Sequence, residues 1–434
     1  MPARTALLSL AALAGTAAAQ AEFPAIFVAN NGNLEGSVST MRIEADGSLT
    51  FVSKVVTGTR SSTSQPCPGC NTYAIDITPD GRFLATAHAA GSSTENLTVY
   101  AVAPDGSLTV VEELPLAQGG LDIQWINNEL LALPLTDLSL TNRVRLFRLD
   151  EDNQLTEIDS AVTGSFNTSI AVHPNRRWLY ANDSLGSNTV RVFDTEGGSL
   201  TLIQTLSLPN YGVAIEVDPS GQYLYAAGGI SNGGNSFAGY AIDPADGSLS
   251  PLAGSPYTSP GASPKGFAFS EDSDFLYVSH GTDATIRGFS LDPDGIPTST
   301  GFSFDVGLQG SLREMNTLGN LLFALDETTA IDGVRGAYSF TIDPSTGNLT
   351  PLPGSPVDTQ GISPNDVVAW AGANPACNPA DLAAPFGVLD LADVQAFVGG
   401  FLAQDAIADL APPAGVFDLA DVQVFVSAFN AGCP

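Results

Sequence analysis

The sequence predicts an all-β chain closed as a seven-bladed β-propeller and followed by a small α-helical domain. Three observations predict this fold. A short strand motif recurs seven times at steps of roughly 45 to 58 residues, a spacing typical of propellers and solenoids. Around the copies, short β-rich runs alternate with turns rich in Gly, Pro and Asp. Near the C-terminus, one loop–helix unit occurs twice in succession.

The recurring motif places Leu or Ile before Tyr, Phe or Ala in an apolar strand. Around each copy the chain has an apolar first strand, the motif strand, an alternating third strand and a fourth strand after an Asp-Gly or Thr-Gly turn. Four such strands form one propeller blade. The seven copies begin at Ile26, Leu84, Leu131, Leu179, Leu224, Leu276 and Leu322.

The two ends of the repeat are offset. The chain begins at Ala25 with a second strand, and the missing first strand appears at residues 365–370. We expect this last segment to complete the first blade. Ring closure of this kind removes the open sheet edges that otherwise aggregate.

The composition is strongly acidic. The chain of 434 residues has 15 Lys and Arg against 46 Asp and Glu, which gives a net charge of −31. Such a chain lacks the basic surface that binds nucleic acid or an anionic membrane, and no apolar stretch after the N-terminus is long enough to span a bilayer. We expect attraction of cations or of a basic partner, or simply solubility in a salty exterior.

The N-terminus and the cysteines predict export. Arg4, an apolar run at residues 6–14 and small residues near position 20 are typical of a signal peptide over residues 1–21. The propeller then covers residues 22–372 and the helical domain residues 373–434. Cys67 and Cys70 form a C-x-x-C, for which a structural disulfide is favoured over a metal site. Cys377 and Cys433 bracket the last domain and are expected to pair. These features predict a secreted or cell-surface location.

The repeats resemble the lactonase-type seven-bladed propellers, which include YVTN-type surface propellers and 6-phosphogluconolactonases. Residues 252–257 (LAGSPY) and 352–357 (LPGSPV) carry the resemblance, together with the triplets at 178–180 and 275–277. The resemblance covers about residues 23–371. It implies an Arg-His pair, a Glu and a later Arg for lactone hydrolysis. In this sequence those positions hold Thr168 and Ser169, Asp183 or Ser184, and His280-Gly281, so the family's way of stabilising an oxyanion is not expected.

Polar residues at the strand ends of one face form a candidate site. Two histidines with several carboxylates are able to bind a metal or to perform acid–base chemistry. The alternative is that these side chains are satisfied by backbone groups of loops. The catalytic candidates are His88, Asp183, His280 and Glu314. The candidate binding residues of the same face are Asn30, Lys265, Arg313, Asp326, Asn365 and Asp366.

The C-terminal domain is a second repeat, because residues 381–395 recur 28 residues later. The two units resemble bacterial dockerin modules of the Gly-Cys-ending type, and a dockerin loop is half of an EF-hand. The resemblance implies possible calcium ligands, and the alternative is that the aspartates cap the helices. We expect four phenylalanines, at 397, 401, 425 and 429, to form the seam between the helices. The calcium candidates are Asp381, Asp390, Asp393, Asp409, Asp418 and Asp421.

Two functions follow from this organisation. The first is a secreted, monomeric propeller that acts as a binding or scaffold module, attached by its dockerin-like tail to a cohesin-like or cell-surface protein. The alternative is an extracellular lactonase-like hydrolase with altered active-site residues. A solvent-reachable cluster of His88, His280 and Glu314 favours the enzyme, and dispersal of these residues favours binding. The sequence implies no cofactor other than calcium in the tail.

Overall fold

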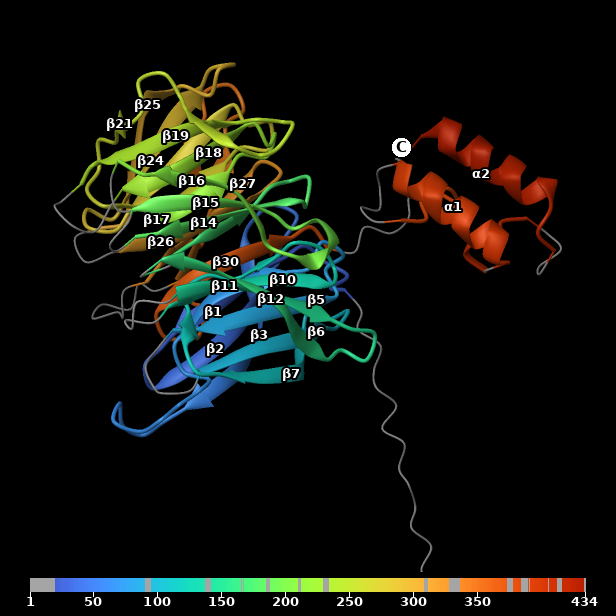
Figure 1. The fold of residues 1–434 in the computed structure, drawn as a ribbon, viewed down its shortest axis with the longest axis horizontal. Coiled ribbons are helices and arrows are strands. Elements are labelled where there is room, and N and C mark those ends of the chain that lie inside the picture. The colour runs from blue at the N-terminus through green and yellow to red at the C-terminus, as the bar shows by residue number, and fades with distance from the viewer. Residues whose placement is uncertain are drawn as a thin grey trace, which may run out of the picture.

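The computed structural model contains a propeller and a pair of helices (Figure 1). The strands of the propeller are grouped in seven sheets of four or five strands. The structure describes residues 20–89, 95–136, 142–164, 166, 168–184, 188–209, 212–228, 234–307, 311–327, 336–372, 378–383, 389, 391–404, 406–411 and 416–432.

The first blade joins the two ends of the propeller chain. It consists of β30 (Pro364–Trp370), β1 (Ala25–Asn31), β2 (Glu35–Ile43) and β3 (Leu49–Thr59), with β30 innermost. β30 pairs antiparallel with β1, and Val367 lies opposite Val28. The prediction that the last strand completes the first blade is therefore confirmed.

The other six blades follow in chain order, each from its innermost strand outward. The second blade has β4 (Thr72–Ile77), β5 (Phe83–His88), β6 (Glu95–Val102) and β7 (Leu108–Leu116). In the third blade, the short strands β8 (Gly119–Gly120) and β9 (Gln124–Trp125) both pair with β10 (Leu130–Thr136), and β11 (Asn142–Leu149) and β12 (Leu155–Gly164) follow. The fourth blade has β13 (Ile170–Val172), β14 (Trp178–Asp183), β15 (Thr189–Asp194) and β16 (Thr201–Ser207), with the short helix η1 (Glu196–Gly198) before β16. The fifth blade has β17 (Gly212–Val217), β18 (Tyr223–Gly228) and β19 (Ser236–Ile242), and both β20 (Leu249–Pro251) and β21 (Tyr257–Thr258) pair with β19. The sixth blade has β22 (Pro264–Phe269), β23 (Phe275–His280), β24 (Thr285–Leu291) and β25 (Pro297–Asp305). The seventh has β26 (Leu312–Leu318), β27 (Leu321–Asp326), β28 (Gly336–Ile342) and β29 (Leu349–Pro351).

The core lies between neighbouring blades. The motif strands are buried on both faces, as their near-continuous apolar sequences require, and Tyr180, Tyr225 and Tyr277 are fully buried. In the fifth and sixth blades, Phe237 packs edge-on against Phe267 and Phe289 with ring centroids 5.9 and 5.2 Å apart. Aromatic rings that meet edge to face add stabilisation beyond the area they bury.

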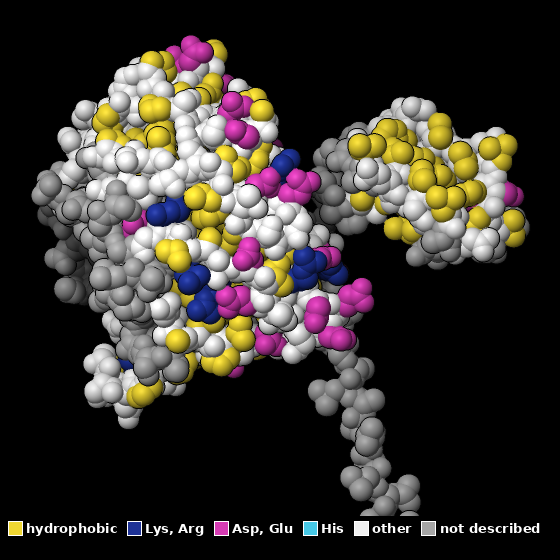
Figure 2. Space-filling model, in the orientation of Figure 1, with side chains coloured by type: hydrophobic (Ala, Val, Ile, Leu, Met, Phe, Trp, Pro, Cys, Tyr) yellow, Lys and Arg dark blue, Asp and Glu magenta, His cyan; other side chains and the backbone are white. Residues whose placement is uncertain are grey.

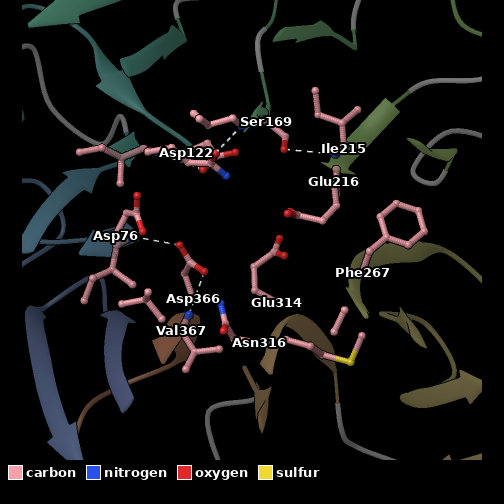
Figure 3. A pocket seen from close by; sticks show the side chains of 18 of the residues that line it. Asp76, Asp122, Ser169, Ile215, Glu216, Phe267, Glu314, Asn316, Asp366 and Val367 are labelled. Carbon is pink, nitrogen blue, oxygen red and sulfur yellow. Dashed lines mark hydrogen bonds between the residues drawn. The ribbon is translucent and has the colours of Figure 1, made fainter. Parts of the chain in front are cut away.

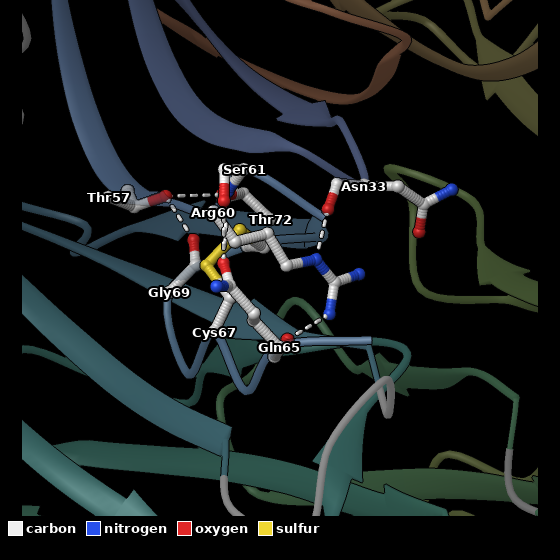
Figure 4. Close-up of a disulfide and its surroundings, with 9 residues drawn as sticks. Asn33, Thr57, Arg60, Ser61, Gln65, Cys67, Gly69 and Thr72 are labelled. Carbon is white, nitrogen blue, oxygen red and sulfur yellow. Dashed lines mark hydrogen bonds between the residues drawn. A yellow bond between two sulfur atoms is a disulfide. The ribbon is translucent and has the colours of Figure 1, made fainter. Parts of the chain in front are cut away.

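The first cysteine pair forms a disulfide before β4. Cys67 and Cys70 are bonded, which confirms the predicted pairing (Figure 4). Arg60 stabilises the loop before the disulfide, because it donates hydrogen bonds from Nε to the carbonyl of Asn33 and from Nη1 to the carbonyl of Gln65. A Cβ at Gly69 would lie 1.9 Å from the carbonyl oxygen of Thr57, so only glycine fits there. Cys377 and Cys433 lie outside the described residues, as does most of the predicted signal peptide.

The C-terminal helices are α1 (Leu391–Ala403) and α2 (Leu419–Ala431), with the short helix η2 (Ala406–Ala408) between them. Phe397 stacks on Phe425 with centroids 4.2 Å apart, while Phe401 and Phe429 flank this pair. The predicted phenylalanine seam is therefore confirmed. None of the described helices is long and apolar enough to cross a membrane.

Candidate functional site

A cavity of about 450 Å³ lies where the innermost strands of the blades meet. Tyr73 and Arg313, near the starts of β4 and β26, line it, and so do Val217 and Phe269, the last residues of β17 and β22. Because residues from both ends of the inner strands contribute, the cavity is a channel that extends through the thickness of the ring. We call it the central channel.

Polar residues line the central channel in two tiers. The inner tier is set by register, because its members pair with the second residue of the motif in the neighbouring strand. Residues two positions earlier form the outer tier, since alternate residues of a strand share a face. The inner tier contains Asp76, Gln124, Glu216 and Asn316, and the outer tier contains Asp122, Ser169, Glu314 and Asp366. Figure 3 shows that the five carboxyl groups of the two tiers gather around one open centre.

Three of the five carboxylates tie neighbouring blades together. The innermost strands leave backbone N–H groups on their free edge, and these groups require acceptors. Asp366 accepts from the N–H of Ile75 at 2.9 Å, and Asp76 accepts from that of Trp125 at 2.6 Å. Asp122 accepts from the N–H of Ile170 at 2.8 Å. These bonds join the first four blades in sequence, so the three aspartates have a structural role.

Glu216 and Glu314 project toward the centre of the channel (Figure 3). Burial raises the pKa of Glu314 to about 7, and the guanidinium of Arg313 opposes that rise. Burial also raises the pKa of Glu216 well above its ordinary value, and the nearby carboxylates of Asp122 and Glu314 raise it further. Both carboxyl groups therefore keep their protons to a higher pH than ordinary glutamates do, and Glu314 titrates near neutral pH. Two such carboxyl groups at one site can serve as an acid and a base.

Arg313 brings a positive charge to this acidic channel. Its guanidinium lies 4.2 Å from the centroid of the Tyr73 ring, and its Nε is 3.9 Å from Oε1 of Glu314. The Tyr73 backbone is itself held by Asn365, whose side-chain amide donates to the Tyr73 carbonyl at 2.5 Å. A cation stacked on an aromatic ring has its orientation fixed by that ring. Arg313 is thus positioned beside Glu314.

Comparisons with known proteins agree with this architecture. The family described as "Lactonase, 7-bladed beta-propeller" matches residues 133–313. The 6-phosphogluconolactonases of Yersinia pestis and Yersinia pseudotuberculosis are 27% identical over 261 residues, which cover 56% of this chain and 73% of theirs. The chain forms a lactonase-type seven-bladed propeller. Two solved structures, a putative 6-phosphogluconolactonase from Bacteroides uniformis and one from Bacteroides fragilis, share this fold.

The two Bacteroides structures are similar to the lactonase-type propeller in fold. They superpose with TM-scores of 0.65 and 0.64 at 17% and 15% sequence identity, and each alignment covers 80% of this chain. It covers 100% of the Bacteroides uniformis chain and 98% of the Bacteroides fragilis chain. At this identity the likeness concerns the fold alone.

The lactonase-type propeller does not bring His88 and His280 to Glu314. Both histidines end second strands, which lie one layer behind the channel, and both are fully buried. His280 Nε2 is 2.7 Å from the hydroxyl of Ser259, and His88 Nε2 is 3.3 Å from that of Thr86. Burial lowers the pKa of each to about 4, so both are neutral. The expectation that these histidines share a funnel with Glu314 is wrong. Their dispersal counts against an enzyme that uses the histidines, so the channel carboxyls are the remaining acid–base candidates.

Other predicted rim residues hold loops. Asp183 accepts from the N–H of Phe166 at 2.9 Å, and Asp326 accepts from that of Ser311 at 3.1 Å. Asn30 is buried and bonds the hydroxyls of Ser39 and Thr359 at 2.9 and 3.0 Å. These three side chains support the segments around the strand ends. Lys265 lies apart from the channel lining in an ion pair with Glu327 at 2.5 Å. Of the predicted residues, the channel gathers Arg313, Glu314, Asn365 and Asp366.

Three channel carboxylates escaped the sequence analysis, namely Asp76, Asp122 and Glu216. A signal for two of them was present, because Asp76 and Glu216 each stand between two apolar residues at the same place in an inner strand. A charged residue inside an otherwise apolar strand requires either a partner or water. In a propeller such a residue is able to face the central channel, and Asp76 and Glu216 both line it.

The aspartates of the C-terminal domain accept backbone hydrogen bonds. Asp393 accepts from the N–H groups of Leu382 and Ala383 at 2.7 and 2.8 Å. Asp421 makes the equivalent bonds 28 residues later, both at 2.8 Å. Asp418 and Asp421 also form a reciprocal capping box at the start of α2. The capping bonds expected as the alternative to calcium are therefore present there, while Asp390 lies outside the described residues. Calcium binding remains a prediction.

Proposed function

We propose that the central channel hydrolyses a lactone, with Glu314 as general base, Glu216 as general acid and Arg313 as the cation that stabilises the oxyanion. The observation that carries this proposal is the pair of glutamates that project toward one centre of the channel, both with raised pKa values, beside the guanidinium of Arg313. Acid–base pairs of this kind operate best when their pKa values lie near the working pH. The likeness to 6-phosphogluconolactonases supports the same reaction class.

Each group has one step. Glu314 removes a proton from a water molecule, whose oxygen bonds to the lactone carbonyl carbon. The negative charge that develops on the carbonyl oxygen faces Arg313, and a fixed cation in a partly dry site stabilises such charge strongly. The bond from the carbonyl carbon to the ring oxygen then breaks. Glu216 gives its proton to that oxygen, and the product is a hydroxy acid.

The proposed substrate is an unphosphorylated sugar lactone. Five carboxyl groups line the channel against two cationic side chains among the described lining residues. A phosphate that carries nearly two negative charges finds few cationic partners there, whereas the hydroxyls of a sugar are good hydrogen-bond partners for carboxyl groups, whether these are protonated or ionised. Thr168 and Ser169 occupy the positions at which the family resemblance implies ionic residues, and this also favours a neutral substrate.

Hydrolysis of glucono-δ-lactone by the purified chain, followed as proton release in weak buffer, tests the proposal. We expect a rate above spontaneous hydrolysis and above that for 6-phosphogluconolactone. Glu314→Gln should lower kcat by roughly 10²- to 10⁴-fold, the usual contribution of a general base. Glu113→Gln, an exposed carboxylate on β7, is the matched control and should leave the rate unchanged. Equal rates for the wild type and Glu314→Gln would contradict the mechanism.

A second role, attachment, is favoured by the surface of the C-terminal helices. Leu391 and Leu419 are each 68% exposed, and Val398 and Val426 are each 49% exposed. These residues are paired by the 28-residue repeat, and Figure 2 shows hydrophobic side chains gathered over the helices. Exposed apolar patches of this kind mark protein interaction sites. We infer that this face binds a cohesin-like or cell-surface protein.

Attachment through the C-terminal helices is the role proposed for an exported protein, and it is tested as follows. Binding of the full chain to immobilised cohesin domains, measured by surface plasmon resonance, tests the partner. A Leu391→Ser and Leu419→Ser double variant should abolish the response while lactone hydrolysis continues. No response from the intact chain would contradict attachment by cohesin.

Mass spectrometry of the exported protein should find an N-terminus near Gln20 or Glu22, and a retained leader would contradict export.

A further inference from the structure

Four blades connect their first two strands by the same tight turn, and one of these turns carries an arginine. In each turn, one residue donates its N–H to the carbonyl three positions earlier at 2.8 or 2.9 Å and has a left-handed backbone. That residue is Gly81 with φ +69°, Gly221 with φ +71°, Ser273 with φ +62° or Arg176 with φ +61°. Glycine adopts this conformation freely, whereas a side chain with a Cβ is strained in it. The turn therefore does not need the arginine.

The Arg176 side chain reaches from the fourth blade to the central channel. It is exposed and lines the cavity, and its Nη1 donates to the carbonyl of Trp125 in the third blade at 3.4 Å. Its charge lowers the pKa of Asp76, in the second blade, against the larger raising effect of burial. Arg176 lies shortly after the end of its inner strand, β13, whereas Arg313 lies near the start of its inner strand, β26. The two cationic side chains of the described channel lining therefore stand at opposite mouths.

We infer that Arg176 binds the carboxylate of a sugar-derived hydroxy acid at the mouth of the channel opposite Arg313. Two of the four turns hold a side chain in place of glycine: that of Ser273 accepts a hydrogen bond from the N–H of Ser220, whereas that of Arg176 reaches the channel. The planar guanidinium presents paired donors that match a carboxylate, and it is exposed to incoming ligand. The inference rests on the proposed function, because a hydroxy acid is the product of lactone hydrolysis.

Calorimetric binding of gluconate to the full chain tests this inference, with glucitol as the uncharged comparison. Arg176→Gly should weaken gluconate binding roughly tenfold or more, as loss of a charge-assisted bond does, and should leave glucitol unaffected. It should also raise Tm by roughly 1–3 °C, because the strain is relieved. Ser273→Gly is the matched control. It relieves the same strain and also removes one hydrogen bond, from the N–H of Ser220 to its hydroxyl at 3.2 Å, but it should leave gluconate binding unchanged.

Three outcomes overturn the inference: no gluconate binding by the wild type, equal gluconate affinity after Arg176→Gly, or equal weakening by Ser273→Gly. The result is separable from the proposed reaction. Arg176-dependent gluconate binding without lactone hydrolysis supports this site and rejects the hydrolase. Lactone hydrolysis together with a gluconate affinity that is the same in the wild type and in Arg176→Gly supports the hydrolase and rejects this site.

Discussion

The hydroxyl of Tyr277 in the sixth blade donates a hydrogen bond to the carbonyl oxygen of Gly347 in the seventh, over 2.9 Å. Tyr225 bonds Gly295 in the same way at 2.6 Å, and Tyr180 bonds Gly247 at 3.1 Å. Each tyrosine belongs to a motif strand, and each glycine belongs to the turn before the fourth strand of the next blade. The two most visible repeats of the sequence are thus the two halves of one contact between blades.

Removal of this hydroxyl should destabilise the propeller. Tyr277→Phe leaves the buried ring in place but removes the donor to Gly347, so the free energy of unfolding in urea should fall by about 1 kcal/mol. Tyr257→Phe is the control, because its hydroxyl bonds the carbonyl of Ala253 at 2.8 Å in an exposed local turn. If both variants lose equal stability, the contact between blades has no special weight.

The repeats explain why the fold could be predicted and the site only in part, since Arg313, Glu314, Asn365 and Asp366 were expected while Asp76, Asp122 and Glu216 were not. The motif strands, their turns and the offset ends are local patterns, and they determine the blades and the closure. The channel depends instead on which residue of an inner strand faces the axis, and that is set by register across blades. His88 and His280 attracted attention by residue type, although a position one strand outward buries them. Glu216 stands out in its strand only as a charge between two apolar residues, and the sequence alone does not say that this position faces the axis.

Stability should depend on pH through Glu216. Its folded-state pKa is raised well above the ordinary 4.5, so the unfolded chain releases this proton first. Stability is therefore lost as pH rises from about 4.5 through the folded pKa, and none is lost from this group below that range. Glu216→Gln should have the wild-type Tm near pH 4 and a higher Tm near pH 8. An equal Tm difference at both pH values would show that Glu216 does not titrate in this way.

The rate of lactone hydrolysis should rise as pH increases through about 7, because Glu314 must lose its proton to act as base. Arg313 opposes the effect of burial on this carboxyl, so Arg313→Gln should raise its pKa and move the rising limb of the kcat/KM profile to higher pH. Lys265→Gln should move the limb less, because Lys265 has a smaller effect on Glu314 and is paired with Glu327. If the rising limb of the kcat/KM profile stays at the same pH in Arg313→Gln, a group other than Glu314 causes that limb.

Calcium removal should loosen the C-terminal helices only in part. Asp393 and Asp421 each accept two backbone N–H groups of the preceding loop, so the loops have internal partners without a metal. A disulfide between Cys377 and Cys433, predicted from the sequence, adds about 4 kcal/mol by closing the chain around both helices. The helical circular dichroism of the oxidised full chain should therefore survive chelation. Reduction together with chelation should abolish it.

Two carboxamide variants separate capping from calcium binding. Asp421→Asn weakens the acceptor of the Leu410 and Ala411 N–H groups, so it should lower the melting temperature of the helical signal with or without calcium, by an amount equivalent to about 1 kcal/mol. Asp305→Asn on β25 is the control and should leave this melting temperature unchanged, because it lies in the propeller. If chelation alone unfolds the helices of the oxidised chain, and Asp421→Asn has no effect once calcium is removed, the aspartates act as calcium ligands and the capping bonds are secondary.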